Sequence, residues 1–168
     1  MKLHRIYPFV ILLCSFSFIS HAQETASKPS VKVSGEVTKP LTLTMDDLLK
    51  MKPISTSMKD RGGAEHNYKG VAMQEILGMA GVTLDKQLRG ENLSKYLLVK
   101  CADGYEVVFS LAELDSSFTD RVVTLAYESD GRPLPANVGP FRVVVPGEKK
   151  PARSSFQVVA LVIKFAKE

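Results

Sequence analysis

The sequence predicts an α+β domain with mixed, largely antiparallel β-sheets and short helices. Short apolar segments with strand-like alternation recur along the chain, from VKVSGEV at 31–37 to FQVVALVIKF at 156–165. The helical segments between them are short, and no series of long crossover helices is present, as a parallel sheet would need. The sequence also has no internal repeat, so we expect one domain.

In the first part of this domain, the sequence predicts a pair of strands followed by a short helix. Residues 31–37 and 41–44 alternate as strands do. Thr44 then begins the segment TMDDLLKM, and Asp47 follows three positions later, which is the pattern of a capping box at a helix N-terminus. Pro53 comes next, as is usual just beyond the end of a helix.

A second helix is predicted at 71–81, where VAMQEILGMAG can place apolar residues on one face and Gly81 at the C-terminal cap. Before it, ISTSM at 54–58 favours a strand, and Gly62 and Gly63 mark a flexible loop. The segment between that loop and the helix is assigned no element.

For the rest of the chain, the sequence predicts mainly strands. KYLLVK (95–100) and YEVVFS (105–110) predict a hairpin around the turn at Asp103. Ser110 and Glu113 form a second capping box, which begins another short helix. The later elements are a strand at 121–128, a turn-rich loop at 130–135, and strands at 141–146 and 156–165.

The N-terminus has the pattern of a secretory signal peptide. A basic start, MKLHR, precedes an apolar run, and Ala22 fits a signal-peptidase site with cleavage before Gln23. We therefore expect residues 1–22 to be a signal peptide of the general secretory route, 23–30 a flexible lead-in, and 31–168 one domain. The protein would be secreted or periplasmic; an uncleaved membrane anchor is the alternative.

Charge and cysteine content exclude several classes of function. The net charge is +4, and loss of Lys2 and Arg5 with the signal would leave +2. Such a weak excess does not indicate a nucleic-acid partner, and no membrane partner is expected after cleavage. Loss of Cys14 would leave Cys101 alone, so no internal disulfide could form. Cys101 is then buried, reactive, a metal ligand or an intermolecular bridge, and we favour burial.

The order of several motifs resembles a known family. VKVSGEV, PLTLTMDDLL, YKGVAMQEILGMAGV, DGYEVVFSLAEL, LAYESDGRPL and GPFRVVVPG follow one another along the chain. In this order they resemble the molybdopterin-binding domain of the sulfite oxidase family, in its small single-domain bacterial form. The resemblance extends over 31–165 and implies that family's fold, a mixed α+β domain built on twisted β-sheets. It also implies a pocket for a pterin cofactor that holds molybdenum on its dithiolene.

The resemblance suggests a role for the basic stretch GPFRVVVPGEKKPARSS at 139–155. In the family, this region binds the cofactor's phosphate with basic side chains and backbone amides. The candidates here are Arg142 and Arg153, with Ser154 as a hydroxyl partner, because arginine can donate two N–H groups to one phosphate. For the two adjacent lysines a solvated turn is favoured, and a solvated hairpin is the alternative for the whole stretch.

Four further residues are candidates for the pocket. Asp103 could accept a hydrogen bond from a ligand amine and Tyr105 could stack on a flat ring, although a tight turn explains both equally well. His66 is expected on the surface or at the pocket mouth, since it has no partner at a metal-binding spacing. Asn137 could bind a ligand heteroatom. The sequence contains no Ser-His-Asp, P-loop or dinucleotide motif.

Three departures from the family pattern argue against molybdenum chemistry. Active members supply a cysteine thiolate to the metal, whereas the segment 54–70 contains no cysteine and has Met58 at about that position. Phe156 stands where the family often has a lysine, and the chain has no tryptophan. Exported relatives that carry the cofactor generally use a twin-arginine signal, which this N-terminus lacks.

We therefore predict an exported domain that binds a pterin-like or other small anionic ligand without molybdenum catalysis; the ligand could be molybdopterin or another pterin. An active molybdopterin-dependent oxidoreductase, with Cys101 or no protein thiolate on the metal, is the first alternative. A degenerate domain with a structural role or a protein partner is the second.

Overall fold

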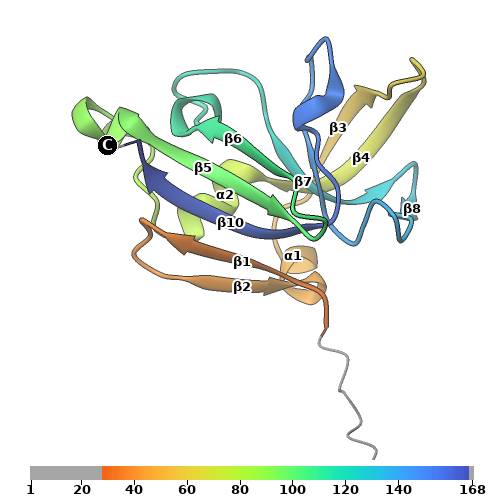
Figure 1. The fold of residues 1–168 in the computed structure, drawn as a ribbon, viewed down its shortest axis with the longest axis horizontal. Coiled ribbons are helices and arrows are strands. Elements are labelled where there is room, and N and C mark those ends of the chain that lie inside the picture. Colours follow the sequence, from red (N-terminus) through yellow and green to blue (C-terminus); the bar gives the residue numbers. More distant parts are fainter. Residues whose placement is uncertain (1–27, 167–168) are drawn as a thin grey trace, which may run out of the picture.

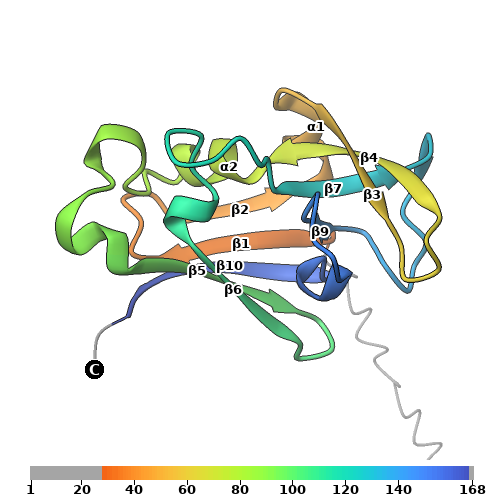
Figure 2. The same cartoon turned by 90° about the horizontal axis from the view of Figure 1, so that it is seen from above.

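The computed structural model describes residues 28–166, whose strands form two β-sheets (Figures 1 and 2). The predicted signal peptide at 1–22 and most of the predicted lead-in lie outside the described residues. Within 28–166, no helix is both long enough and apolar enough to cross a membrane.

The first sheet has five strands. In spatial order they are β2 (Leu41–Thr44), β1 (Ser30–Gly35), β10 (Val158–Phe165), β5 (Lys95–Cys101) and β6 (Glu106–Ser110). β1 and β10 run parallel, whereas every other neighbouring pair is antiparallel. The first and last strands of the described chain therefore lie side by side inside this sheet.

The second sheet is antiparallel throughout. Its strands are β3 (Ile54–Lys59), β4 (Glu65–Ala72), β7 (Thr124–Ser129) and β8 (Arg132–Pro133), while β9 (Arg142–Val144) pairs with the start of β7. The two sheets together confirm the predicted α+β class with mixed, largely antiparallel sheets.

The main core lies on one face of the first sheet, where helix α2 (Met73–Met79) packs. Figure 2 shows α2 and the second sheet on the same side of the first sheet. Ile76 and Leu77 of the helix are completely buried and share a core cluster with Val31 and Val33 of β1. Lys32 between these two valines is exposed, so the two-residue period of the strand explains which side chains face the helix.

Both predicted capping boxes are confirmed. At α1 (Met45–Lys50), the Thr44 amide donates to the Asp47 carboxylate at 2.9 Å, and the Asp47 amide donates back to the Thr44 hydroxyl at 3.4 Å. Ser110 and Glu113 make the same pair of bonds at the short 3₁₀ helix η3 (Leu111–Glu113). Gly81 follows α2 with a φ of +69°, as predicted for a C-terminal cap.

The helix predicted at 71–81 begins too early, because β4 continues to Ala72. Val71 and Ala72 pair with Leu125 and Thr124 of β7, which satisfies their backbone groups in the sheet instead of in a helix. β4 was not predicted, since EHNYKG has no alternation of apolar and polar residues.

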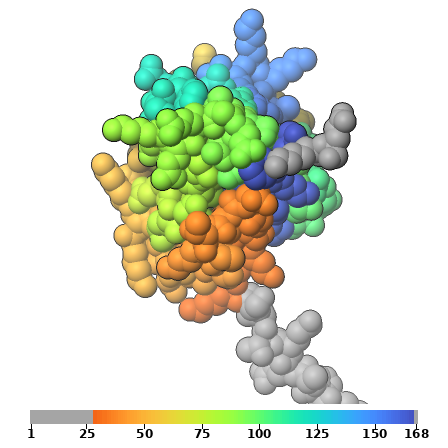
Figure 3. Space-filling model, turned by 90° about the vertical axis from the view of Figure 1, so that its left-hand side faces the viewer, coloured from red at the N-terminus to blue at the C-terminus, as the bar shows by residue number. Residues whose placement is uncertain are grey.

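Strand ends differ from the prediction by a few residues elsewhere. β1 already begins at Ser30, within the predicted lead-in, and ends at Gly35, which has a φ of +92°. β7 begins only at Thr124, although the Val123 carbonyl still accepts a hydrogen bond from the Met73 amide at the start of α2. Two further 3₁₀ helices, η1 (Asp85–Gln87) and η2 (Gly90–Ser94), lie beside the β1–β2 connection at one end of the molecule (Figure 3).

Candidate functional site

A cavity of about 500 Å³ opens between the β3–β4 hairpin, the β5–β6 turn and the loop from β9 to β10. We call this loop, residues 145–157, the basic loop; it contains the 3₁₀ helix η4 (Pro151–Arg153) and stands between β6 and the β3–β4 hairpin in Figure 1. The wall consists of Met58, Asp60, Arg61, Gly62, Tyr68, Asp103, Tyr105, Arg142, Pro151, Ala152, Ser154, Ser155 and Phe156.

Arg142 is the central charged group of this wall. It is only 6% exposed, and its guanidinium carbon lies 4.6 Å from the ring centres of both Tyr68 and Phe156. Its NH1 group donates to the Tyr68 hydroxyl at 2.9 Å, and NH2 contacts the Ser154 carbonyl at 3.4 Å. Two aromatic faces thus hold a buried cation, an arrangement that stabilises positive charge.

No carboxylate neutralises this cation. Among the described residues, no acidic side chain lies within ion-pair distance of Arg142, and its buried Nε–H has no hydrogen-bond partner. Burial lowers the pKa of Arg142, which the contact with Tyr68 opposes, yet a guanidinium stays protonated at neutral pH. A buried charge without a counterion is costly, and an anion in the cavity would offset that cost.

Two serines lie beside Arg142 in the basic loop, and both are 4% exposed. The Ser154 hydroxyl accepts a hydrogen bond from the Val145 amide at 3.0 Å and donates to the Met58 sulfur, also at 3.0 Å. The Ser155 hydroxyl has no hydrogen-bond partner of good geometry among the described residues. The Ser155 carbonyl accepts a hydrogen bond from the Val143 amide adjoining Arg142, so this serine lies next to the buried cation, and its hydroxyl also lies near the Cys101 thiol.

The thiol of Cys101 does not reach the cavity wall. It is 6% exposed and confirms the expectation of a buried cysteine. Burial raises the pKa of Cys101, the nearby Ser155 hydroxyl opposes the shift, and the Asp103 carboxylate adds to it. Burial thus disfavours the thiolate form of Cys101. Across 28–166, no group of three or more His, Cys, Asp or Glu side chains could hold a metal ion.

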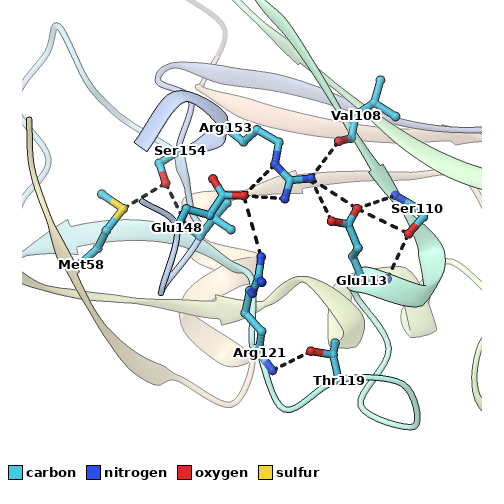
Figure 4. A network of polar contacts seen from close by, with 10 residues as sticks. Met58, Val108, Ser110, Glu113, Thr119, Arg121, Glu148, Arg153 and Ser154 are labelled. Atoms are coloured by element: carbon cyan, nitrogen blue, oxygen red, sulfur yellow. Dashed lines mark hydrogen bonds and ion pairs between the residues drawn. The ribbon is translucent and has the colours of Figure 1, made fainter. Parts of the chain in front are cut away.

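Arg153 lies outside the cavity wall, where two carboxylates bind it (Figure 4). Its Nε–H donates to Glu148 at 2.8 Å, and its NH1 lies 3.1 Å from Glu113. The guanidinium also lies 4.6 Å from the ring centre of Phe109. The structure therefore does not bring the two predicted arginines together: the charge of Arg153 is neutralised within the fold, and that of Arg142 is not.

Of the other predicted residues, some line the cavity and others do not. Asp103 and Tyr105 line the cavity, and the Asp103 carboxylate accepts the Tyr105 amide at 2.9 Å, as expected for a tight turn. Tyr105 is half-exposed and donates from its hydroxyl to the Ala152 carbonyl at 3.0 Å, which ties the β5–β6 turn to the basic loop. Asn137 and the two lysines of the basic loop are exposed and do not line the cavity.

His66 lies beside the cavity and not in its wall. Its Nδ1 is 2.7 Å from the Asp130 carboxylate and its Nε2 is 3.5 Å from that of Asp60, which does line the cavity. The hydrogen bond to Asp130 raises the pKa of His66, burial opposes the shift, and the contact with Asp60 adds to it. This histidine joins the tip of the β3–β4 hairpin to the β7–β8 turn.

The stability of the protein should fall as pH rises through the pKa of His66. The folded state binds the proton more tightly than the unfolded state, so the stabilisation is complete below the ordinary histidine pKa of about 6.5 and is lost above the raised pKa. His66 is the only histidine after residue 21. Urea unfolding at a series of pH values around 6–8 measures the slope, and His66→Gln should flatten it. An unchanged slope in this variant would contradict the assignment.

The aromatic partners of Arg142 were not singled out from the sequence. Tyr68 lies in a polar segment that predicts no element, and Phe156 stands out in the sequence only as a departure from the family pattern. Asp60, Arg61 and Ser155 carry no local signal, because a loop of polar residues has the same composition whether it faces a ligand or water.

Comparisons with known proteins agree with this fold. The model of one protein family, the oxidoreductase molybdopterin binding domain, matches residues 20–150. No curated protein matches the chain. Among solved structures, the sulfane dehydrogenase SoxCD from Paracoccus pantotrophus is similar, with a TM-score of 0.64 and 23% sequence identity over 83% of this chain. The match covers 39% of that protein's chain, and at this identity it shows the fold alone.

Proposed function

Since the chain belongs to the oxidoreductase molybdopterin-binding domain family, we propose that its cavity binds a pterin-like or other small anionic ligand without molybdenum catalysis. We also propose that the protein is exported through the general secretory route and cleaved before Gln23. An unfolded chain on that route could not carry a cofactor loaded in the cytoplasm, so the ligand would enter after export.

The unpaired, buried guanidinium of Arg142 carries the proposal. Arginine side chains inside proteins are normally paired with carboxylates, and this one faces a cavity instead. Its Nε–H and the Ser155 hydroxyl are both buried donors without a partner among the described residues. Buried donors that lack a partner in the free protein are the groups that a bound anion satisfies.

The residues of the wall fit the organic part of a pterin cofactor. The ring of Tyr105 is half-exposed and offers a stacking surface, and the Asp103 carboxylate could accept hydrogen bonds from an amino group. Arg142 would bind the anionic end. A pterin dithiolene supplies the metal-binding sulfurs in this family, and the protein contributes position and charge.

The same wall does not fit a molybdenum ion held by a protein thiolate. Met58 is the sulfur-bearing residue of the wall, and its thioether already accepts a hydrogen bond from Ser154. A neutral thioether is a much weaker donor than a thiolate. Cys101 is buried and lies outside the wall.

Arg142→Met tests the proposal, because methionine fills similar space without the charge. Wild type and variant are purified from the exported fraction and denatured; pterin fluorescence in the supernatant and molybdenum by elemental mass spectrometry are then measured. We expect a pterin fluorophore from the wild type, at least about tenfold less from Arg142→Met, and molybdenum far below about one per chain.

Lys149→Met is the matched control, since it removes an exposed positive charge outside the cavity. It should retain as much ligand as the wild type. Equal retention by Arg142→Met would remove Arg142 from the site, and molybdenum near about one per chain would overturn the metal-free proposal.

A further inference from the structure

The charges of the residues in the cavity wall sum to zero. Four residues of the wall are ionised at neutral pH: Arg61 and Arg142 are positive, and Asp60 and Asp103 are negative. The other cations of the basic loop do not change this balance. Arg153 is bound to Glu113 and Glu148, and the two lysines are exposed outside the wall.

These four charged residues differ in their exposure to solvent. Arg142 is buried, whereas Arg61, Asp60 and Asp103 are all exposed. The carboxylate of Asp60 is also held in place by the Ala64 amide at 2.9 Å and by His66. A ligand would thus meet one desolvated positive charge inside the cavity and, nearer the solvent, two carboxylates and the guanidinium of Arg61, which together carry a net negative charge. Interactions with buried charges are screened less by water and salt than those with exposed ones.

The uncharged part of the wall is suited to a flat ring. Phe156 and Tyr105 are each 47% exposed, and both line the cavity together with Pro151 and Ala152. Phe156 also stacks on the guanidinium of Arg142, so an aromatic ligand beside it would have its anionic group close to that cation. The Ser155 hydroxyl provides one further uncharged donor.

We infer that the cavity selects a planar aromatic or heteroaromatic ligand with a single negative charge, such as a carboxylate, over the corresponding phosphomonoester. This inference rests on the proposed function and specifies its ligand class. The buried guanidinium of Arg142 neutralises one charge, and the second charge of a phosphomonoester would face the exposed part of the wall, where Asp60 and Asp103 outweigh Arg61. Like charges brought together in a binding site disfavour the ligand that carries them.

Probes with one ring and different charges test the selectivity. Pterin-6-carboxylate, 6-hydroxymethylpterin monophosphate and neutral 6-hydroxymethylpterin are titrated into the ligand-free mature protein, with fluorescence as the readout. At about pH 7.5 the phosphate carries close to two charges, because its second pKa is about 6. We expect the carboxylate to bind about tenfold more tightly than the phosphate and also more tightly than the neutral ring. 2-Naphthoate and 2-naphthyl phosphate form a second pair that does not depend on the pterin ring.

Asp103→Asn gives the wall a net positive charge and keeps the oxygen that accepts the Tyr105 amide. We expect it to reduce the ratio of carboxylate to phosphate affinity by about threefold or more. The control is Asp46→Asn, which removes an exposed carboxylate on α1 outside the cavity wall and should leave the ratio unchanged.

The outcomes separate this inference from the proposed function. Phosphate binding that equals or exceeds carboxylate binding, and that is lost in Arg142→Met, would overturn the charge selection and leave the anion site intact. An unchanged ratio in Asp103→Asn would also contradict the inference. If no member of either probe pair binds, the proposed function fails and the inference fails with it.

Discussion

Replacing Gly70 with alanine should lower the free energy of unfolding by more than about 3 kcal/mol. A Cβ atom at this position would lie 2.2 Å from the Leu125 carbonyl oxygen and 2.6 Å from the Ala126 Cα. Both are backbone atoms of β7, at the irregularity where β4 shifts register between Lys69 and Gly70. A side-chain rotation cannot relieve this contact, so the two strands would have to separate.

Gly78→Ala is the matched control for this variant. Apart from its own helix backbone and chain neighbours, no atom lies within 4 Å of a Cβ at Gly78, the second-to-last residue of α2. Alanine is favoured over glycine in a helix, so this substitution should raise the stability by about 0.5–1 kcal/mol. Urea unfolding of both variants measures the difference, and equal effects would contradict the close approach of β4 to β7.

The Gly70 substitution should also affect the cavity. Tyr68 lies two residues earlier on β4, and it holds the guanidinium of Arg142 through its ring and its hydroxyl. Separation of β4 from β7 would move this tyrosine, since Tyr68 pairs with Ser129 across the same ladder. The packing of the second sheet and the geometry of the site are therefore linked at this strand.

The sequence predicts those parts of the fold whose determinants are local. The capping boxes at Thr44 and Ser110 depend on residues three positions apart, and the hairpin of β5 and β6 depends on two apolar segments and a turn. β4 could not be predicted in this way. Its polar residues become a strand only because β3 and β7 pair with both of its edges, which are contacts between segments far apart in the chain.

The candidate site was predictable to a similar degree. The motif order indicated Arg142, Asp103, Tyr105 and Ser154, and the structure gathers all four around one cavity. The difference between Arg142 and Arg153 had no local signal. It arises because Glu113, which follows β6, is brought next to Arg153 by the fold, while no acidic residue is brought next to Arg142.

Arg153→Met should lower the free energy of unfolding by about 2–3 kcal/mol. The change leaves Glu113 and Glu148 without their shared cation, and the Glu148 side chain is only 15% exposed. Breaking a fully buried ion pair costs about 3–5 kcal/mol and an exposed pair contributes less than about 1 kcal/mol, so this partly exposed network should fall between them. Urea unfolding of the variant measures the loss.

Adding Glu148→Gln to Arg153→Met should recover part of the lost stability, because it removes a largely buried carboxylate whose remaining partner, Arg121, is 3.8 Å away. Lys149→Met, in the same loop, should change the stability by less than about 0.5 kcal/mol. Failure of the double variant to recover stability would show that Arg153 acts through its packing on Phe109 and not through charge.

Arg142→Met should give the opposite pattern, with ligand retention lost and stability within about 1 kcal/mol of the wild type, since it removes a buried charge that has no counterion. Arg153→Met should retain more ligand than Arg142→Met once both proteins are folded. If Arg153→Met instead lost the ligand and kept its stability, Arg153 would be the anion-binding residue and its ion pairs would have to open on binding. Arg142 and Arg153 would then have the opposite of the roles that their burial and their partners indicate.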